Sequence, residues 1–151
     1  GSCPGGGSKD KEGFSARLMW RVDNFHSLNL IKNRHKAYLV QYVYYPERHE
    51  SKNWGEDIIY RNEVGRIFVR SKKWYTLSMN IKLAKDSRKK DTLLAWVNGN
   101  KVSHKKLNLR KNNNYAVDQL MFSLFFGGHE SSWATKKKEK IYFRNFVITG
   151  K

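Results

Sequence analysis

Near the start of the chain stand the residues Phe14-Ser15-Ala16-Arg17-Leu18-Met19-Trp20-Arg21-Val22. Apolar and polar side chains alternate along this stretch, so that Leu18 and Trp20 fall on one side and Arg17 and Arg21 on the other. Successive side chains of a β-strand point to opposite faces of its sheet. The period of two therefore predicts a strand with one buried apolar face and one face that carries two guanidinium groups.

Residues 74–83 repeat this alternation. Their inward side is expected to comprise Tyr75, Leu77, Met79, Ile81 and Leu83, and their outward side Thr76, Ser78, Asn80 and Lys82. Strands with one apolar face bury that face against another layer of the fold. We therefore expect the following side chains to be buried between two sheets: Phe14, Leu18, Trp20, Leu77, Met79 and Ile81.

The rest of the chain also reads as short strands separated by turns. Further strands are predicted at residues 37–45, 66–70, 92–97, 101–102, 107–109, 116–126 and 141–148. Asn98-Gly99 is the preferred dipeptide of a two-residue hairpin turn, whereas residues 47–65 are predicted to form a charged loop. The pattern predicts an all-β fold, an antiparallel jelly roll or β-sandwich with a concave polar groove.

We expect a single domain at residues 14–151, preceded by a flexible segment at residues 1–13 that is rich in Gly, Ser and Lys. The start of the chain is typical of a processed or cloned boundary and not of a signal peptide, so further chain is expected upstream. Cys3 is the only cysteine, which excludes an internal disulfide and a zinc site made of cysteines. No stretch of the sequence approaches the roughly 18 consecutive apolar residues of a membrane-spanning helix, so no such helix is expected.

The chain is strongly basic. It has 30 Lys and Arg residues against 13 Asp and Glu residues, which gives a formal net charge of +17. A positive field of this size favours polyanionic partners, namely nucleic acid, anionic membrane surfaces or acidic polysaccharides. The many aromatic residues favour a packed β-rich domain over a disordered basic tail.

Residues 37–45 place two phenol groups on one face. Tyr42 and Tyr44 are two residues apart, so their side chains are expected roughly 7 Å apart on the same side of a strand. Tyrosine is also a common strand residue, and a structural role is the alternative. The polar faces of the strands that start at Ser15, Tyr42 and Thr76 are the candidates to line the groove. Besides the two tyrosines they supply Ser15, Arg17, Arg21, Asn80 and Lys82.

A run of aromatic residues near the end of the chain stops at a pair of glycines. The residues are Phe122-Ser123-Leu124-Phe125-Phe126, followed by Gly127-Gly128 and His129. A double glycine allows a positive φ or a close approach of the backbone. A strand that stops there presents a polar rim to a ligand, so His129 is a candidate sugar contact. The alternative is an aromatic core strand that ends in an ordinary loop. The histidines show no metal-ligand spacing.

Several segments together resemble the polysaccharide lyases of family 14, the β-jelly-roll alginate and glucuronate lyases. These segments are residues 14–21, 42–46, 73–83, 95–99, 122–134 and 142–146. The resemblance covers nearly the whole chain from Gly13 onward. It implies a jelly-roll fold, a lyase acting on an acidic polysaccharide, and a secreted or extracellular location.

In that family, a Ser-x-Arg on one strand and a Tyr-x-Tyr on the next line the catalytic groove, beside a lysine from a Gly-rich upstream segment. The resemblance assigns the catalytic positions to Ser15, Arg17, Tyr42 and Tyr44. Pro4-Gly5 match the upstream segment, but Ser2 stands where the lysine would be. We expect Arg21, Asn80, Lys82 and His129 to contribute to substrate binding.

These side chains suit the chemistry of such a lyase. Elimination at a 4-linked uronate needs a cation for the C6 carboxylate, a base for the C5 proton and an acid for the leaving O4. Arg17 can hold a carboxylate with two N–H groups and stays charged. Two phenols can divide the base and acid work, or one phenol can serve as both, and nearby cations stabilise a phenolate. Ser15 is expected to orient the substrate or a phenol. No metal or cofactor is expected.

Two other functions fit the same features. A lectin-like module without catalytic activity would hold an acidic or sulfated glycan in the same groove, and the missing lysine favours it. Nucleic-acid binding would suit the charge, but the aromatic residues fall mostly on apolar strand faces and do not form a basic aromatic platform. The sequence therefore predicts a polysaccharide lyase first, a glycan-binding module second and a nucleic-acid-binding protein third.

Overall fold

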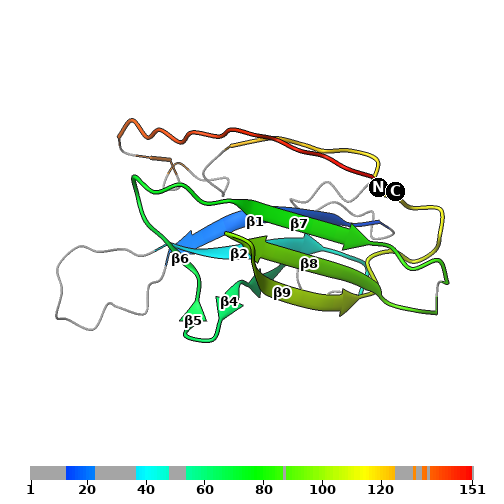
Figure 1. The fold of residues 1–151 in the computed structure, drawn as a ribbon. Coiled ribbons are helices and arrows are strands. Elements are labelled where there is room, and N and C mark those ends of the chain that lie inside the picture. Colours follow the sequence, from blue (N-terminus) through cyan, green and yellow to red (C-terminus); the bar gives the residue numbers. More distant parts are fainter. Residues whose placement is uncertain are drawn as a thin grey trace. The chain divides into compact units, whose positions relative to one another are not determined.

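The structure is a computed structural model of the chain. It describes residues 13–22, 37–47, 54–86, 88–124, 131, 134–135 and 137–150. The chain divides into two compact units, Gly1–Gln119 and Leu120–Lys151. All the strands of the described residues belong to the first unit (Figure 1).

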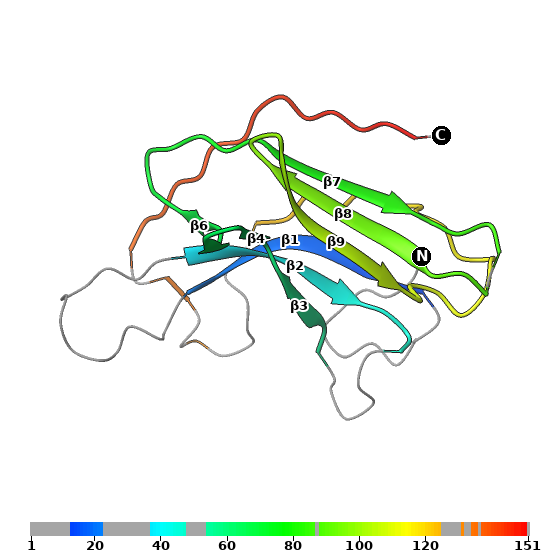
Figure 2. The ribbon, with the colours of Figure 1, turned by 60° about the horizontal axis from the view of Figure 1, so that its bottom comes forward.

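These strands are short and antiparallel to their neighbours. They are β1 (Ser15–Val22), β2 (Ala37–Tyr44), β3 (Glu56–Ile59), β4 (Arg61–Asn62), β5 (Gly65–Arg66), β6 (Phe68–Val69), β7 (Leu77–Lys82), β8 (Asp91–Val97) and β9 (Asn100–Leu107). One sheet has the order β1-β2-β3, with β6 also paired to β2. A second sheet has the order β7-β8-β9, and β4 pairs with β5 in a small ribbon. Figure 2 shows the two larger sheets as separate layers.

The two larger sheets pack face to face. Val43 of β2 and Leu93 of β8 are both fully buried in one apolar cluster, and Leu39 and Ala95 share a second cluster that also contains Tyr60. A core that draws alternate residues from both sheets is the packing of a β-sandwich. The prediction of an antiparallel all-β sandwich is confirmed. The hairpin turn at Asn98-Gly99 is present between β8 and β9, with both residues at positive φ.

The predicted core is confirmed at its centre. Phe14 is buried, and Ile81 is partly buried against the same cluster. The prediction was wrong for four side chains, which are 38–41% exposed: Leu18, Trp20, Leu77 and Met79.

The alternation gave the direction of those four side chains correctly. Leu18 is paired with Gln41, and the amide of Gln41 donates to the sulfur of Met79 in the other sheet, so this face of each strand points between the layers. However, β1 and β7 are the end strands of their sheets among the described residues. An inward side chain on an end strand has a covering neighbour on one side only, and it therefore stays partly exposed.

Other predicted boundaries also change. The predicted loop at residues 47–65 contains β3 and β4, and no strand is assigned to the described parts of the predicted strands at 116–126 and 141–148. In the second unit, the Phe122 ring lies 4.8 Å from the Phe143 ring and 5.1 Å from the Phe146 ring, edge to face. Aromatic packing accounts for the apolar composition there, but a strand needs a hydrogen-bonded neighbour as well.

Candidate active site

Strand β2 has one face in the core and one face turned away from the second sheet. Its pairing places Ser15 opposite Tyr44, Arg17 opposite Tyr42 and Arg21 opposite Tyr38. On its other side, β3 places Asp57 opposite Tyr42. Directly opposite residues of an antiparallel pair share a face. We call this outward surface the arginine–tyrosine face; it comprises Ser15, Arg17, Arg21, Tyr38, Tyr42, Tyr44 and Asp57.

The two phenols that the sequence placed together are in direct contact. The hydroxyl oxygens of Tyr42 and Tyr44 are 3.3 Å apart, and their rings pack edge to face with centroids 5.2 Å apart. Tyr44 is buried, whereas Tyr42 is partly exposed. The geometry therefore allows one proton to lie between the two oxygens, with Tyr42 nearer to solvent.

Arg17 joins this pair as the sequence analysis expected. Its guanidinium carbon lies 5.2 Å from the centroid of the Tyr44 ring, within the range of a cation–π contact. The Ser-x-Arg and Tyr-x-Tyr segments thus meet because β1 and β2 are hydrogen-bonded neighbours in this register.

Arg21 lies on the same face but has a different environment. Its guanidinium carbon is 5.0 Å from the centroid of the Tyr42 ring, and its Nε and Nη2 atoms donate to the two carboxylate oxygens of Asp57 at 2.9 and 3.0 Å. The hydrogen bonds to Asp57 raise the pKa of Arg21. This two-point ion pair fixes Arg21 over the Tyr42 ring.

Gly55 makes a contact that sequence reasoning missed. Its backbone N–H donates to the hydroxyl oxygen of Tyr42 at 2.8 Å. A Cβ atom at this position would lie 2.7 Å from the carbonyl oxygen of Val43 and 3.1 Å from ring atoms of Tyr42 and Tyr44. Only glycine lets the backbone approach the two phenols this closely. The available signal was a glycine beside Trp54 in a segment rich in charged residues.

The environment of Tyr42 raises its pKa to about 12. Burial is the largest cause, and the hydrogen bond with Tyr44 acts in the same direction. The amide of Gly55 and the charge of Arg21 oppose this shift, because both favour the phenolate. As expected of a nearby cation, Arg21 acts to lower the pKa of Tyr42. Burial has the larger and opposite effect on this pKa, so Tyr42 keeps its proton at neutral pH.

Ser15 lies at the same end of the face. It is the cross-strand partner of Tyr44, and its hydroxyl is buried without a hydrogen-bond partner among the described residues. A buried hydroxyl in that position has hydrogen-bonding capacity left for a ligand or a water molecule. Its predicted role in orienting a substrate or a phenol stays a prediction.

The remaining predicted binding residues are not brought to this face. Asn80 and Lys82 are exposed on β7, in the other sheet. Because Met79 and Ile81 point between the layers, Asn80 and Lys82 point to the outer side of the second sheet. His129 lies outside the described residues, as do Ser2 and the rest of the upstream Gly-rich segment.

Asp57 is the second functional candidate that sequence reasoning missed, because it lies in a segment read as a loop.

No group of three or more His, Cys, Asp or Glu side chains that could hold a metal ion occurs within the described ranges. Nor does that part of the chain contain a helix with the length and apolar character needed to span a membrane.

Of three comparisons of the chain with known proteins, one gave a match. No match was found among curated proteins or among solved structures. The family described as Polysaccharide lyase 14 matches residues 1–146, which is nearly the full length and includes both strands of the arginine–tyrosine face. The chain therefore belongs to polysaccharide lyase family 14.

Proposed function

We propose that this protein cleaves an acidic, uronate-containing polysaccharide, such as alginate or glucuronan, by β-elimination at the arginine–tyrosine face. One observation carries the proposal: the Arg17 guanidinium stacks on the ring of Tyr44, whose phenol oxygen lies 3.3 Å from that of Tyr42. These groups supply a cation, a proton acceptor and a proton donor, which are the three requirements of the reaction. The net charge of +17 attracts a polyanionic chain to the protein.

Arg17 sets the orientation of the substrate. A guanidinium that binds the C6 carboxylate with two N–H groups withdraws charge from it, and the neighbouring C5 proton becomes more acidic. C5 carries that carboxylate and is therefore held close to Tyr44, the ring on which Arg17 stacks. The next carbon, C4, with its leaving oxygen, then lies toward Tyr42.

The two phenols have different tasks in this arrangement. The reaction starts from the pair with one proton between its two oxygens. The Tyr44 oxygen takes the C5 proton; the electrons of the C5–H bond form the C4=C5 double bond, and the C4–O4 bond breaks. Tyr42, whose pKa of about 12 keeps it protonated, donates its proton to O4. The new hydroxyl of Tyr44 then returns a proton to Tyr42 across 3.3 Å, which restores the starting state.

Polysaccharides of this kind are found outside cells and in cell walls, and we propose an extracellular site of action on that basis.

The test is incubation of the protein with a panel of mannuronate, guluronate, glucuronate and sulfated polymers. A lyase forms a C4=C5 double bond, so ultraviolet absorbance of the unsaturated product should rise with at least one polymer. Arg17→Lys keeps the charge but loses the two-point contact, and it should lower the rate roughly 10- to 100-fold. Absence of unsaturated product from every polymer would contradict the proposal.

A lectin-like function is the second candidate, and Ser2 at the position of the family's lysine favours it. A face whose more exposed phenol stays protonated still offers hydrogen bonds, cations and aromatic surfaces to a glycan, even when no proton is transferred. Binding of a uronate polymer without any unsaturated product would identify this function.

A further inference from the structure

The second sheet has an outer surface that the proposed reaction does not use. Leu93, Ala95 and Val97 of β8 are buried in the core, so the residues that alternate with them point away from it. Their cross-strand partners on β7 and β9 share this side. We call this surface the outer β8 face; it comprises Ser78, Asn80, Lys82, Thr92, Leu94, Trp96, Lys101, His104 and Lys106.

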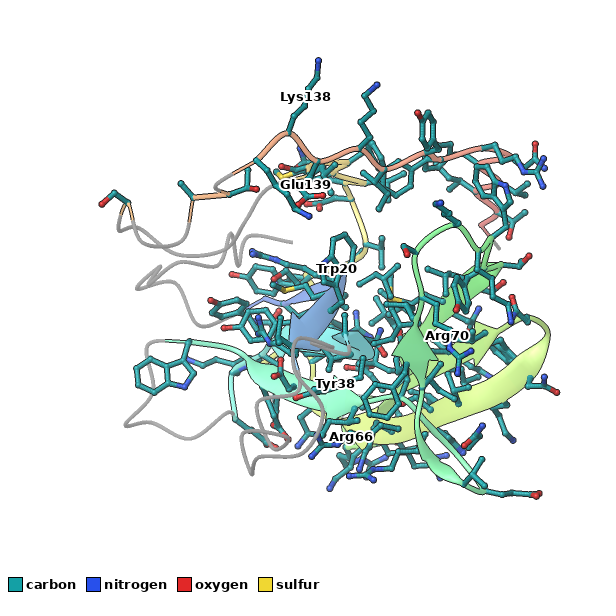
Figure 3. The ribbon with its side chains drawn as sticks, turned by 90° about the vertical axis from the view of Figure 1, so that its left-hand side faces the viewer. Trp20, Tyr38, Arg66, Arg70, Lys138 and Glu139 are labelled. Carbon is teal, nitrogen blue, oxygen red and sulfur yellow. The ribbon has the colours of Figure 1, made fainter. Side chains whose placement is uncertain are left out.

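The outer β8 face and the arginine–tyrosine face lie on opposite sides of the sandwich, because each sheet buries its other side in the shared core. Figure 3 shows the two layers from one side, with the blue strand β1 of the first sheet to the left and the green strand β7 of the second sheet to the right. A polymer segment that occupies the arginine–tyrosine face therefore cannot contact the outer β8 face at the same time. A ligand of the outer β8 face is a different segment or a different chain.

The charged residues of the outer β8 face are all lysines. Lys82 and Lys106 are exposed and flank Thr92 on the two neighbouring strands, which places their Cα atoms about 10 Å apart. Lys101 is exposed on the same side, at the other end of the face. No Asp or Glu occurs among the nine residues. Cations without neighbouring carboxylates on the same face attract a chain that carries repeated negative charges.

A β-bulge keeps Lys101 on this face. Residues three apart in a regular strand point to opposite sides, yet Lys101 lies opposite Trp96 and His104 lies opposite Leu94, both on the outer side. The register of β9 shifts between these two pairs, and the extra residue, Val102, is buried in the core. The bulge thus places a lysine next to the indole of Trp96.

Trp96 supplies an aromatic surface to the outer β8 face. It is partly exposed and lies between Ser78 of β7 and Lys101 of β9. The apolar C–H face of a sugar ring packs on an aromatic ring, while the polar groups of the sugar reach the side chains on either side. Single-stranded nucleic acids instead stack successive bases on several aromatic side chains, and Trp96 is the one Phe, Tyr or Trp residue of this face. The combination favours an acidic polysaccharide.

We infer that the outer β8 face is a second binding surface, which holds an acidic polysaccharide chain away from the groups that cleave it. The face contains neither arginine nor tyrosine, the residues that the proposed reaction uses. A long polymer bound here keeps its other segments near the arginine–tyrosine face at a raised effective concentration. The surface therefore assists the cleavage of long chains but not of short oligosaccharides. This inference rests on the proposed function for the identity of the polymer.

The experiment removes the three lysines together, in the variant Lys82→Gln/Lys101→Gln/Lys106→Gln. Binding of long alginate and glucuronan chains is measured by calorimetry in the Tyr42→Phe background, in which the polymer is cut slowly. The affinity should fall roughly 10-fold at low salt, and by less at high salt, where the charges are screened. With Tyr42 restored, kcat/KM should fall by a similar factor for the long polymer and stay unchanged for the shortest cleaved oligosaccharide.

Trp96→Leu tests the aromatic contact. It should lower the affinity for the long polymer roughly 2- to 10-fold, and this loss should persist at high salt because it does not depend on charge. The matched control for charge removes three exposed lysines from loops outside β7, β8 and β9, in the variant Lys72→Gln/Lys89→Gln/Lys111→Gln. Circular dichroism and thermal unfolding check that each variant is folded. If Trp96→Leu is not folded, the two lysine variants decide.

The outcomes separate this inference from the proposed function. The second surface is overturned by an unchanged affinity in the lysine variant of the outer β8 face, by an equal loss in the loop control, or by an equal loss of affinity for duplex DNA. A loss of kcat/KM that is as large for the shortest oligosaccharide also overturns it. If the wild type cleaves no polymer, the lyase proposal fails and the affinities alone decide. A loss confined to variants of the outer β8 face then supports the surface.

Discussion

The two larger sheets of the protein are both basic, but only one of them has the features of an active site. The sheet β7-β8-β9 carries exposed lysines, among them Lys82, Lys101, Lys105 and Lys106. The sheet β1-β2-β3 instead combines its arginines with tyrosine rings, a carboxylate and a close backbone amide. The comparison shows that positive charge alone does not distinguish the two sheets, whereas the proposed chemistry needs cations fixed beside groups that exchange protons.

The largest expected difference is in turnover, between variants that remove a phenol hydroxyl from one sheet and a variant that changes an exposed lysine on the other. Tyr42→Phe or Tyr44→Phe deletes a proton-transfer group and keeps the ring, so turnover should fall on the order of 10²- to 10⁴-fold. Lys105→Gln, an exposed change on the other sheet, should alter turnover little. The measurement is the rate of formation of unsaturated product at saturating polymer. Wild-type turnover in both tyrosine variants would show that the phenols are structural.

Glycine substitutions provide a second contrast between the sheets. Gly55→Ala forces a Cβ against Val43 and the two phenol rings, which should cost about 1–3 kcal/mol in the free energy of unfolding and displace the phenols. Gly99→Ala, in the β8–β9 hairpin, meets no neighbouring atom but has a φ of 80°, which should cost about 1 kcal/mol of backbone strain.

Urea unfolding and steady-state kinetics separate the two glycine effects. Both variants should lose stability, but only Gly55→Ala should also lose activity under conditions in which it is folded. Full activity in folded Gly55→Ala would mean that the amide contact to Tyr42 has no role in the reaction.

The smallest expected effect concerns alkaline pH. Tyr42 keeps its proton up to a pH of about 12 in the folded protein, whereas a phenol in the unfolded chain loses it near pH 10. Above about pH 10 the unfolded state therefore binds fewer protons, and the contribution of Tyr42 to stability is lost between about pH 10 and 12. The urea midpoint should fall less steeply over this window in Tyr42→Phe than in the wild type. Identical slopes would show that Tyr42 titrates normally.

The sequence predicted the parts of the site that depend on a single strand or on two consecutive strands. The period of two placed Tyr42 and Tyr44 together, and the family resemblance matched Arg17 to them. Gly55 and Asp57 were not found, because their segment has no clear alternation and their positions depend on how β3 pairs with β2. Pairing between strands separated by a loop is set by tertiary packing and not by local pattern.

The same limit explains the errors in the predicted core. Alternation gives the direction of a side chain, but exposure depends on what lies beside the strand. Leu18 and Met79 point inward and stay partly exposed because their strands lie at the ends of their sheets. Asn80 and Lys82 were predicted at the groove because a sequence does not show which polar strand faces belong to the same sheet. In the structure they lie on the outer side of the other sheet.

The spacing of the two phenols also bears on how such an enzyme can change. Tyr42 and Tyr44 are neighbours on one face of one strand, so the pleat of that strand sets the spacing of their Cβ atoms. Their side chains, held by contacts with the Gly55 amide and Arg21, bring the two oxygens to 3.3 Å. No hinge or loop has to close to bring them together. Under the proposed function, mutations in segments that contact neither phenol can therefore alter which polymer is recognised without disturbing the proton exchange, so that substrate preference and chemistry can evolve separately.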